Sequence, residues 1–310
     1  MKKREAYYPL RMELRVNGAL YLMVLPGLLS LLFFNYGPML GLSVAWLDYN
    51  PLKGFAKSTF VGWKYFLEAI HSRFIWDALK NTILIKLGQT LVTFPGSVLI
   101  ALLMHEVGRR YRKFVQTATI LPYFISWIVI VSMIKALFSV NGGLVNSVMV
   151  HYMGWKKPKD FMSDPTFFRT LVIFEDIWKM GGYWAMIYLS AITAIDETLY
   201  EVARLDGAGR WRQMTAVTLP GIRPTLLTMA IMLSGYLISG PFEQVYTQLS
   251  PAVYSTGDII ETYTYRIGFQ NSRYGFSTAV SLMQSIASTS LVLLTNLLIR
   301  QFNRRENSFL

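Results

Sequence analysis

The chain has 310 residues, of which 53% are hydrophobic and only 15% are charged, a balance too apolar for an ordinary soluble domain. Its 30 Lys and Arg residues exceed its 18 Asp and Glu residues and give a net charge of +12. Because the chain has no cysteine, disulfides, thiolate metal ligands and cysteine nucleophiles are excluded. The composition predicts a membrane protein in which apolar spans alternate with polar loops.

Six apolar segments follow one another along the chain, and each is long enough to cross a bilayer as a helix of about 20 residues. They lie at 18–46, 82–105, 116–138, 167–195, 225–249 and 276–299. The basic stretch 1–17 resembles the start of a signal peptide, but the apolar run behind it is too long and has no small-residue cleavage site. We therefore predict an N-terminal arm, 1–17, followed by one all-α, polytopic transmembrane domain, 18–310.

Basic residues gather in short segments on one side of this topology. The arm, 109–113, 204–223 and 300–305 are rich in Lys and Arg, whereas the longer loops on the other side mix dilute basic residues with acids. Cytoplasmic loops of membrane proteins carry such an excess, so both termini are predicted to be cytoplasmic. This placement explains the positive net charge, so binding to nucleic acid is not needed to account for it. The sequence also contains no aromatic and basic RNA-binding signature.

A polar segment, 196–222, separates the fourth span from the fifth and begins with the sequence DETLYEVARLDGAG. Its spacing predicts a short amphipathic helix with Asp196 as the N-cap. One face of that helix carries Leu199, Val202, Ala203 and Asp206. Gly207 and Gly209 supply a residue that is free to adopt a positive φ, and they leave a corner without bulky side chains.

A second helical piece is predicted to run from this corner to about Val217. Pro220 is expected to end that piece, and Pro224 fits the first turn of the next span, where a missing N–H costs nothing. The segment would then form an L-shaped pair of small helices that projects from the membrane on the cytoplasmic side.

The whole pattern resembles the EAA loop of ABC-importer permeases: a Glu, two small residues, a Gly six positions after the Glu, an aliphatic residue and Leu-Pro. Val202 departs mildly from the alanine that is usual in the family. The resemblance implies that 196–222 is a coupling loop, which docks into a groove on a separate ATPase. Glu201 and Arg204 would make charge-assisted contacts at the rim of the groove. The predicted coupling residues are Glu201, Ala203, Arg204, Asp206, Gly207, Ala208, Gly209, Val217, Leu219 and Pro220.

The resemblance extends over nearly the whole chain. Stretches such as FPGSVLIALLMHEV and ETYTYRIGFQNSRYGFSTAVSL are similar to permeases that import complex oligosaccharides, including alginate and rhamnogalacturonan fragments. The family implies a maltose-permease type of helical bundle in a bacterial cell membrane. It also implies several partners: a second, different permease, two ATPase subunits, an extracellular solute-binding lipoprotein and an oligosaccharide.

The chain lacks the residues for chemistry of its own. It contains no GxxxxGK[ST] phosphate loop, so ATP and Mg²⁺ would be bound by the partner ATPase, and the chain is expected to be a non-catalytic subunit. His105 and Glu106 are adjacent, but no HExxH motif follows. With three histidines and no cysteine, neither a metal site nor a cofactor is expected.

Polar residues inside two of the spans form a candidate sugar path, because such groups are costly in lipid and usually face a bundle interior, a partner or water. Aromatic rings can stack on sugars, while amides and carboxylates can bind hydroxyl groups. Two other readings stay open: the tryptophans as interface anchors, and Glu175 or Asp176 as ion-pair partners of Lys179. The candidates are Glu175, Asp176, Trp178, Lys179, Trp184, Tyr188, Glu243, Gln244, Tyr246 and Gln248.

Two alternatives belong to other functional classes. A secondary transporter that works alone would use Glu175, Asp176, Lys179 or Glu243 to couple ions or protons to transport. A membrane enzyme acting on lipid-linked sugars would need paired carboxylates or a metal facing a cavity, and no recognisable spacing in the sequence supports one.

Overall fold

The computed structural model describes residues 10–306, which are helical apart from short loops and one two-stranded hairpin. In that hairpin β1 (Leu47–Asp48) pairs antiparallel with β2 (Thr59–Phe60), with Leu47 opposite Phe60. The predicted all-α class is therefore confirmed. The predicted arm 1–17 lies partly outside the described residues, and helix α1 (Leu10–Leu31) begins within its described part.

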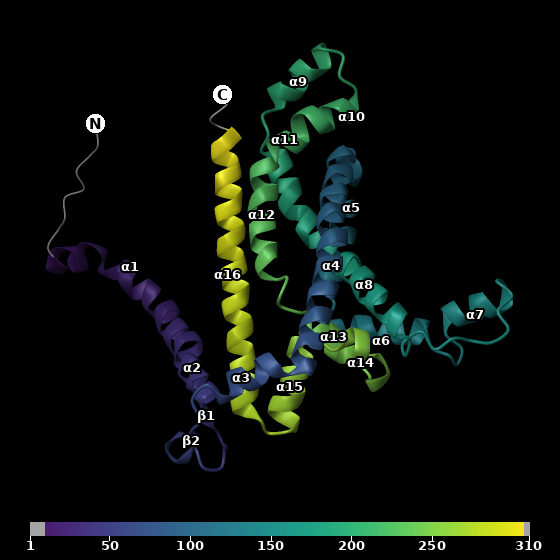
Figure 1. Cartoon of the computed structure of the whole chain (residues 1–310). Coiled ribbons are helices and arrows are strands. Elements are labelled where there is room, and N and C mark those ends of the chain that lie inside the picture. Colours follow the sequence, from purple (N-terminus) through teal and green to yellow (C-terminus); the bar gives the residue numbers. More distant parts are fainter. Residues whose placement is uncertain (1–9, 307–310) are drawn as a thin grey trace.

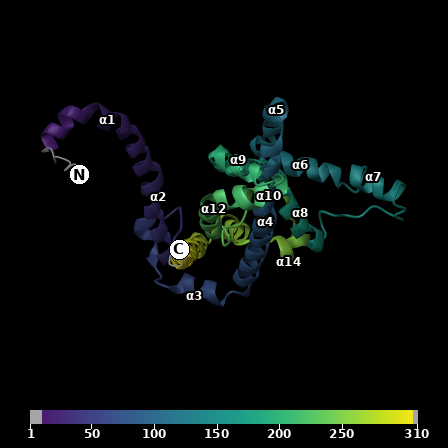
Figure 2. The ribbon, with the colours of Figure 1, turned by 90° about the horizontal axis from the view of Figure 1, so that it is seen from above.

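The first predicted span, 18–46, is helical throughout but stands apart from the rest of the molecule (Figures 1 and 2). Helix α1 continues through a π-helical turn, η1 (Leu32–Tyr36), into α2 (Gly37–Met39) and the 3-10 helix η2 (Leu40–Trp46). The wide π turn lies directly before Pro38, whose ring cannot donate an N–H to the preceding turn. Only the C-terminal end of this span packs on the bundle, where Ala45 joins an apolar cluster with α3 (Lys64–His71) and α16 (Tyr274–Glu306).

The centre of the bundle is the long contact between α4 (Arg73–Glu106) and α8 (Pro165–Thr193), which contain the second and fourth predicted spans. Two glycines of α4 allow this approach. A Cβ on Gly88 would lie 2.3 Å from Cδ1 of Ile173, and a Cβ on Gly96 would lie 2.4 Å from Cδ1 of Ile177. Helix α12 (Arg223–Gly235) packs mainly on α16, which contains the sixth predicted span.

The third predicted span, 116–138, is not one straight helix. Helix α5 (Arg109–Ile120) passes into a 3-10 turn, η4 (Leu121–Phe124), and α6 (Trp127–Leu137) then leaves at an angle of 93°. Pro122 lies in the turn and the Ser126 side chain caps α6. Lys179 of α8 donates from Nζ to the carbonyl oxygens of Tyr123 and Ile125, which the broken helix leaves without helical partners.

The fifth predicted span, 225–249, is also broken. Helix α12 ends at Gly235, and α13 (Phe242–Gln248) begins after a turn that contains Gly240 and Pro241. The backbone N–H of Gly240 donates to Glu261 Oε1 at 2.6 Å, so a residue of α15 (Ile260–Tyr265) helps to hold the turn.

Shorter elements complete the described chain. On the side of the predicted outer loops they are η3 (Phe55–Lys57), α7 (Leu144–His151), η6 (Pro251–Val253), α14 (Tyr254–Gly257) and η7 (Arg266–Gln270). Between α8 and α12 they are α9 (Glu197–Leu205), α10 (Arg210–Gln213), η5 (Met214–Thr218) and α11 (Leu219–Gly221).

Three helical stretches of the described chain are long and apolar enough to cross a membrane: Asn17–Trp46, Arg73–Glu106 and Tyr274–Gln301. The count reaches five if each bent pair, Arg110–Phe124 with Trp127–Leu137 and Arg210–Gly221 with Arg223–Gly235, is one span. Helix α8 has 29 residues but is not among these stretches. The predicted count of six is therefore not confirmed.

Candidate coupling loop and translocation path

The candidate coupling loop, 196–222, forms the predicted pair of small helices at one end of the molecule. Figure 1 shows α9 and α10 at the same end as the last turns of α16, away from the β hairpin and α15. Asp196 is the N-cap of α9, and its Oδ1 accepts from the N–H of Thr198 at 3.0 Å. That hydrogen bond lowers the pKa of the Asp196 carboxyl below its ordinary value.

The corner after α9 depends on Gly207. Its φ is +76°, a left-handed conformation that glycine adopts without strain. The N–H of Gly207 donates to the carbonyl of Arg204 at 3.0 Å, and the N–H of Ala208 donates to that of Ala203 at 2.9 Å. This pair of bonds is a Schellman motif, which satisfies the last carbonyls of the helix. Of the two glycines predicted to supply a positive φ, Gly207 has one and Gly209, at −67°, does not.

The second half of the loop runs farther than predicted. Pro220 does not end the helix, which continues to Gly221. The π turn η5 directly precedes Leu219 and Pro220 and leaves room for a residue without an N–H. The break comes at Ile222, which is fully buried in an apolar cluster with α4 and α8, and the next helix has Pro224 in its first turn as predicted.

Three polar contacts brace the two small helices. Gln213 Nε2 donates to the carbonyl of Ala208 at 2.7 Å, and the hydroxyls of Tyr200 and Thr218 lie 3.0 Å apart. Arg210 pairs with Glu106 of α4 at 3.3 Å, although both side chains are largely exposed. The first two bonds hold α9 and α10–η5 at a fixed angle, while the exposed ion pair contributes little energy.

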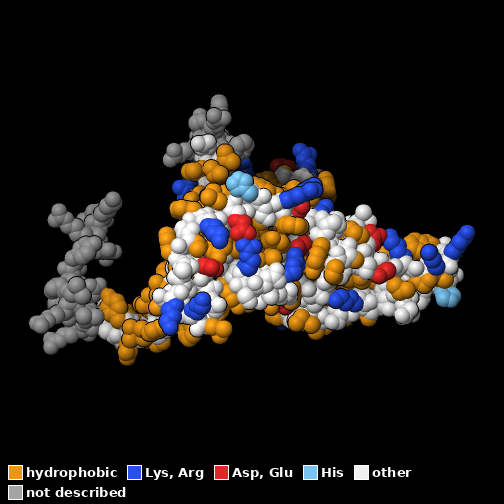
Figure 3. Space-filling view, turned by 60° about the horizontal axis from the view of Figure 1, so that its bottom comes forward, with side chains coloured by type: hydrophobic (Ala, Val, Ile, Leu, Met, Phe, Trp, Pro, Cys, Tyr) orange, Lys and Arg blue, Asp and Glu red, His pale blue; other side chains and the backbone are white. Residues whose placement is uncertain are grey.

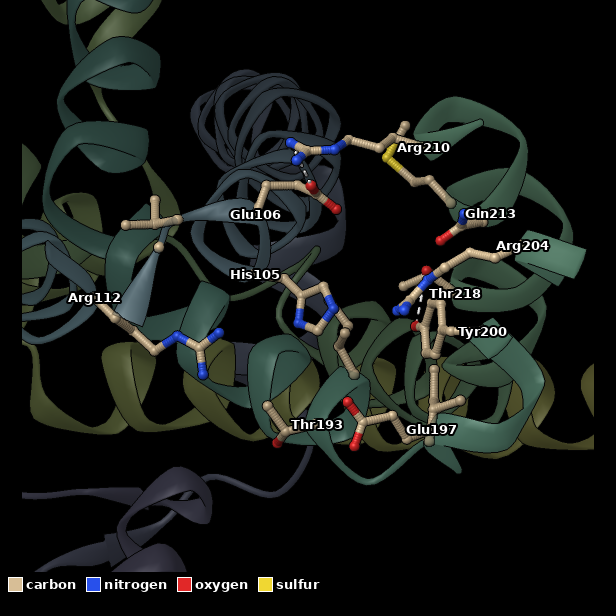
Figure 4. Close-up of a pocket in the computed structure, with 15 residues that line it drawn as sticks. His105, Glu106, Arg112, Thr193, Glu197, Tyr200, Arg204, Arg210, Gln213 and Thr218 are labelled. Atoms are coloured by element: carbon tan, nitrogen blue, oxygen red, sulfur yellow. Dashed lines mark hydrogen bonds and ion pairs between the residues drawn. The ribbon is translucent and has the colours of Figure 1, made fainter. Parts of the chain in front are cut away.

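Helix α9 has two faces with different surroundings. Leu199, Val202 and Leu205 are 52%, 56% and 88% exposed, so this apolar face has no cover in the described chain. Glu197, Tyr200 and Arg204 lie on the opposite face, because a helix has about 3.6 residues per turn. They line a cavity of about 780 Å³ between the loop and the ends of α4, α5 and α8 (Figure 4).

The predicted coupling residues are distributed over this loop as follows. Exposed are Glu201, Arg204, Asp206, Gly207, Gly209 and Pro220; half-buried are Ala203, Ala208, Val217 and Leu219. Arg204 lies on the cavity side of α9 and not on the free apolar face, so a role at the rim of an ATPase groove stays a prediction. His105 and Arg112, which also line the cavity, were not singled out as site residues from the sequence.

Three predicted path residues meet in a buried amide and carboxylate cluster. Glu175 Oε2 accepts from Gln244 Nε2 at 2.8 Å and from Gln248 Nε2 at 2.9 Å. Gln89 of α4 joins the cluster by donating to Gln244 Oε1 at 3.0 Å. The three predicted residues therefore bind one another across α8 and α13. Within this cluster, Glu175 Oε1 and Gln248 Oε1 are buried and have no partner among the described residues.

Three others line a second cavity, of about 290 Å³, between α4, α8 and α12. Asp176, Trp184 and Tyr188 face it from α8. From α4 it is lined by Lys86, Gln89, Thr90, Thr93 and Phe94, and Thr93 Oγ1 donates to Asp176 Oδ2 at 2.6 Å. The α4 residues were missed, although Lys86, Gln89 and Thr93 recur at the spacing of one helix face, a polar stripe in an apolar span.

The remaining four path candidates lie elsewhere. Lys179 is buried at the α5–α6 corner, where it donates to backbone carbonyls and pairs with neither Glu175 nor Asp176. Trp178 is half exposed, and Glu243 and Tyr246 are exposed at the surface of the described chain. Tyr246 stacks on Phe242, with ring centroids 5.1 Å apart. A sugar contact by any of the ten residues stays a prediction.

Comparison with known proteins identifies a matching family and similar permeases. Residues 95–308 match the family described as binding-protein-dependent transport system inner membrane component. The chain is 38% identical to the polygalacturonan/rhamnogalacturonan transport system permease protein YteP of Bacillus subtilis, over 97% of this chain and 93% of YteP. It is 36% identical to protein LplB of the same organism, over 92% of this chain and 89% of LplB.

The fold is similar to solved structures as well. A crystal structure of a bacterial ABC transporter involved in the import of the acidic polysaccharide alginate contains a chain with a TM-score of 0.86 and 33% identity. That match covers 94% of this chain and 98% of the other. A crystal structure of a bacterial alginate ABC transporter in complex with an alginate pentasaccharide-bound periplasmic protein gives a TM-score of 0.85 at 33% identity. This chain belongs to the family of inner membrane components of binding-protein-dependent transport systems.

Proposed function

We propose that the chain is one permease subunit of a bacterial ATP-driven importer and that its cargo is an oligosaccharide delivered by an extracellular binding protein. The observation that carries the proposal is the braced coupling loop, whose apolar face of Leu199, Val202 and Leu205 has no partner within the described chain. Exposed apolar patches on a rigid element are typical of surfaces that bind another protein. Two ATPase subunits, which bind ATP and Mg²⁺, supply that partner.

A second permease subunit is proposed to cover α1 and α16. The apolar 18-residue windows of both helices are 0% buried within the described chain. In the space-filling view of Figure 3, the described part of the protruding first span shows mainly hydrophobic side chains. Lipid can cover part of such a surface, but a span held only at its outer end gains a fixed position when a partner helix packs against it.

The proposed topology has six spans, with both termini and the coupling loop in the cytoplasm. Helix α8 is the sixth span beside the five from apolar stretches, and at about 1.5 Å per residue its 29 residues exceed the hydrocarbon thickness of about 30 Å. Three of its charged side chains find partners inside the bundle: Glu175 Oε2 accepts from two glutamines, Asp176 accepts from Thr93, and Lys179 donates to backbone carbonyls. A polar span of this kind is tolerated when it faces protein.

The proposed sugar path runs beside α8. Trp184, Tyr188 and Asp176 present aromatic faces and a carboxylate to the second cavity, opposite the polar stripe of α4. Exposed Trp178, Glu243 and Tyr246 extend the same chemistry to the surface that a second permease would close. Relatives named for galacturonan and alginate transport favour a polysaccharide fragment as the cargo.

The test is reconstitution. The chain is purified with its second permease and ATPases, placed in liposomes and supplied with a sugar-loaded binding protein. We expect sugar uptake that requires ATP and all subunits. Ion-gradient-driven uptake by this chain alone would support the secondary-transporter alternative and overturn the proposal.

A further inference from the structure

The cavity behind the coupling loop is lined by more positive than negative groups. Three arginines, Arg112 of α5, Arg204 of α9 and Arg210 of α10, face it together with two glutamates and one histidine. The glutamates are Glu106 of α4 and Glu197 of α9, and the histidine is His105 of α4. Glu106 is already paired with Arg210 at 3.3 Å, so Glu197 alone remains to balance Arg112 and Arg204.

Arg112 and Arg204 have no counter-ion within residues 10–306. No ion pair or hydrogen bond joins either guanidinium group to another side chain there. Two buried atoms in the cavity wall, Arg112 Nε and His105 Nδ1, have no hydrogen-bond partner in the described chain. A buried polar group without a partner is destabilising, so an acceptor that reaches these atoms would stabilise the cavity wall.

The three side chains converge. In Figure 4, Arg112 and Arg204 reach from opposite walls toward the space around His105, and the hydroxyl of Tyr200 lies on the Arg204 side. The cavity, at about 780 Å³, is much larger than one small anion. Glu197 and Thr193 on the adjoining wall offer acceptors and a hydroxyl to an uncharged part of a ligand.

We propose that this cavity binds a phosphate group carried by a small polyhydroxyl moiety, with Arg112, Arg204 and His105 as the phosphate ligands. Guanidinium groups bind phosphate through paired N–H donors, and a phosphate has enough acceptor oxygens for two arginines and a histidine. Two sources have this chemistry, the headgroup of an anionic phospholipid and a free sugar phosphate. Because Arg112 belongs to the bundle and Arg204 to the coupling loop, the bound phosphate holds the loop against the bundle.

Binding is measured on the purified, delipidated chain with whatever partner subunits co-purify, so the outcome does not depend on transport or on the cargo. One arm titrates glucose 6-phosphate, and the other compares phosphatidylglycerol with phosphatidylcholine, each followed by native mass spectrometry. We expect one saturable site per chain in one of the two arms. Selective binding of phosphatidylglycerol identifies a lipid site, and binding of glucose 6-phosphate identifies a metabolite site.

The variant series separates this site from general surface charge. Loss of two charge-assisted contacts in the double variant Arg112→Gln, Arg204→Gln should weaken binding about tenfold or more. The control Lys113→Gln removes one positive charge from the next position of α5, where the side chain is exposed, and should bind as the unmodified chain does. Thr193→Trp fills the cavity without a change in charge and should also prevent binding, which covers the case that the double variant fails to fold.

The proposal is overturned if neither probe binds saturably. It is equally overturned if the double variant and Thr193→Trp bind as tightly as the Lys113→Gln control, because the arginines then contribute only to the general positive surface.

Discussion

Lys179 is a charged side chain inside the helical bundle, and its partners are the backbone carbonyls of Tyr123 and Ile125. A lysine in a membrane span is costly unless it finds acceptors, and carbonyls at a broken helix are costly unless they find donors. One contact removes both costs. The sequence offered Lys179 as a sugar contact or as a partner for Glu175 or Asp176, because the helix break that supplies its real acceptors lies on another element.

Gly207 is required for its backbone conformation and not for space within the chain. A Cβ at this position would meet no atom within 4 Å, but at φ +76° it costs about 1–2 kcal/mol. We expect Gly207→Ala to weaken the coupling of ATP hydrolysis to transport severalfold. Gly207→Asn should retain more coupling than Gly207→Ala despite its larger side chain, because asparagine tolerates the left-handed region.

The measurement is sugar-stimulated ATP hydrolysis by the assembled importer. Gly209→Ala is the matched control, since Gly209 has φ −67° and its Cβ position is also open. An order of activity that follows side-chain size, with Gly207→Asn worse than Gly207→Ala, would contradict the backbone explanation and point to contact with the ATPase.

The Glu175 cluster is predicted to be structural rather than a site of ion coupling. Gln248→Leu removes one of the two donors to Glu175 and should lower the free energy of unfolding by roughly 1–3 kcal/mol. Glu175→Gln keeps a polar side chain of the same shape and should leave ATP-driven uptake within about twofold of normal, since a difference of that size is well under 1 kcal/mol. Thermal unfolding in detergent and uptake in liposomes check the two expectations. Abolished uptake in a folded Glu175→Gln variant would revive the ion-coupled alternative.

At the scale of the element, the helices were predictable from apolar length, and their breaks were not. Helices α1, α4, α8 and α16 overlap apolar segments of the sequence, and an uninterrupted helix satisfies its own backbone. The corners after Phe124 and Gly235 are held by Lys179 and Glu261, residues of other elements. No local pattern contains that information: Pro122 and Pro241 permit a break, but Pro26 lies inside α1 without one.

The coupling loop was predictable in more detail than the sugar path, because its shape depends on local contacts and the path depends on contacts between distant elements. Its N-cap and its glycine corner arise from neighbours within ten positions, and local rules govern such contacts. The stop at Pro220 was predicted wrongly because a π turn can admit a proline into a continuing helix. The path instead depends on which polar residues of α4, α8 and α13 meet, and packing decides that.

The stability of helix α9 should depend on pH through its N-cap, Asp196. The carboxylate of Asp196 accepts from the Thr198 N–H, which lowers the pKa of Asp196. The folded state therefore favours the ionised form, so the cap stabilises α9 above the ordinary aspartate pKa of about 4 and is lost as the pH falls below it. We expect hydrogen exchange of the α9 amides, corrected for the intrinsic pH dependence, to accelerate in acid.

Asp196→Ala should exchange several times faster at neutral pH and lose this pH dependence, while Asp196→Ser should stay protected at every pH, because serine caps without a charge. If the alanine variant kept the same acid-induced acceleration, another group would be responsible.

At the scale of the molecule, the structure has a bundle, a span that stands apart and a loop at one end (Figure 1). The bundle is held by three apolar clusters, one of which joins the coupling loop to α4 and α8 through Ile222. A force on the loop therefore reaches the helices that carry the polar path directly, without a flexible linker. The proposed topology requires that the loop and α7 with its following residues face opposite sides of the membrane.

The absence of cysteine makes that requirement testable with single substitutions. Leu205→Cys lies on the exposed face of α9, and Lys157→Cys lies in an exposed loop after α7. A membrane-impermeant maleimide applied to intact cells should label Lys157→Cys and spare Leu205→Cys, and inverted vesicles should reverse the pattern. In inverted vesicles stripped of ATPase, labelling of Leu205→Cys should rise further, because the docked subunit covers the apolar face of α9. Labelling of both positions from the same side would exclude the six-span topology, whereas labelling of Leu205→Cys that is indifferent to the ATPase would place the docking surface elsewhere on the loop.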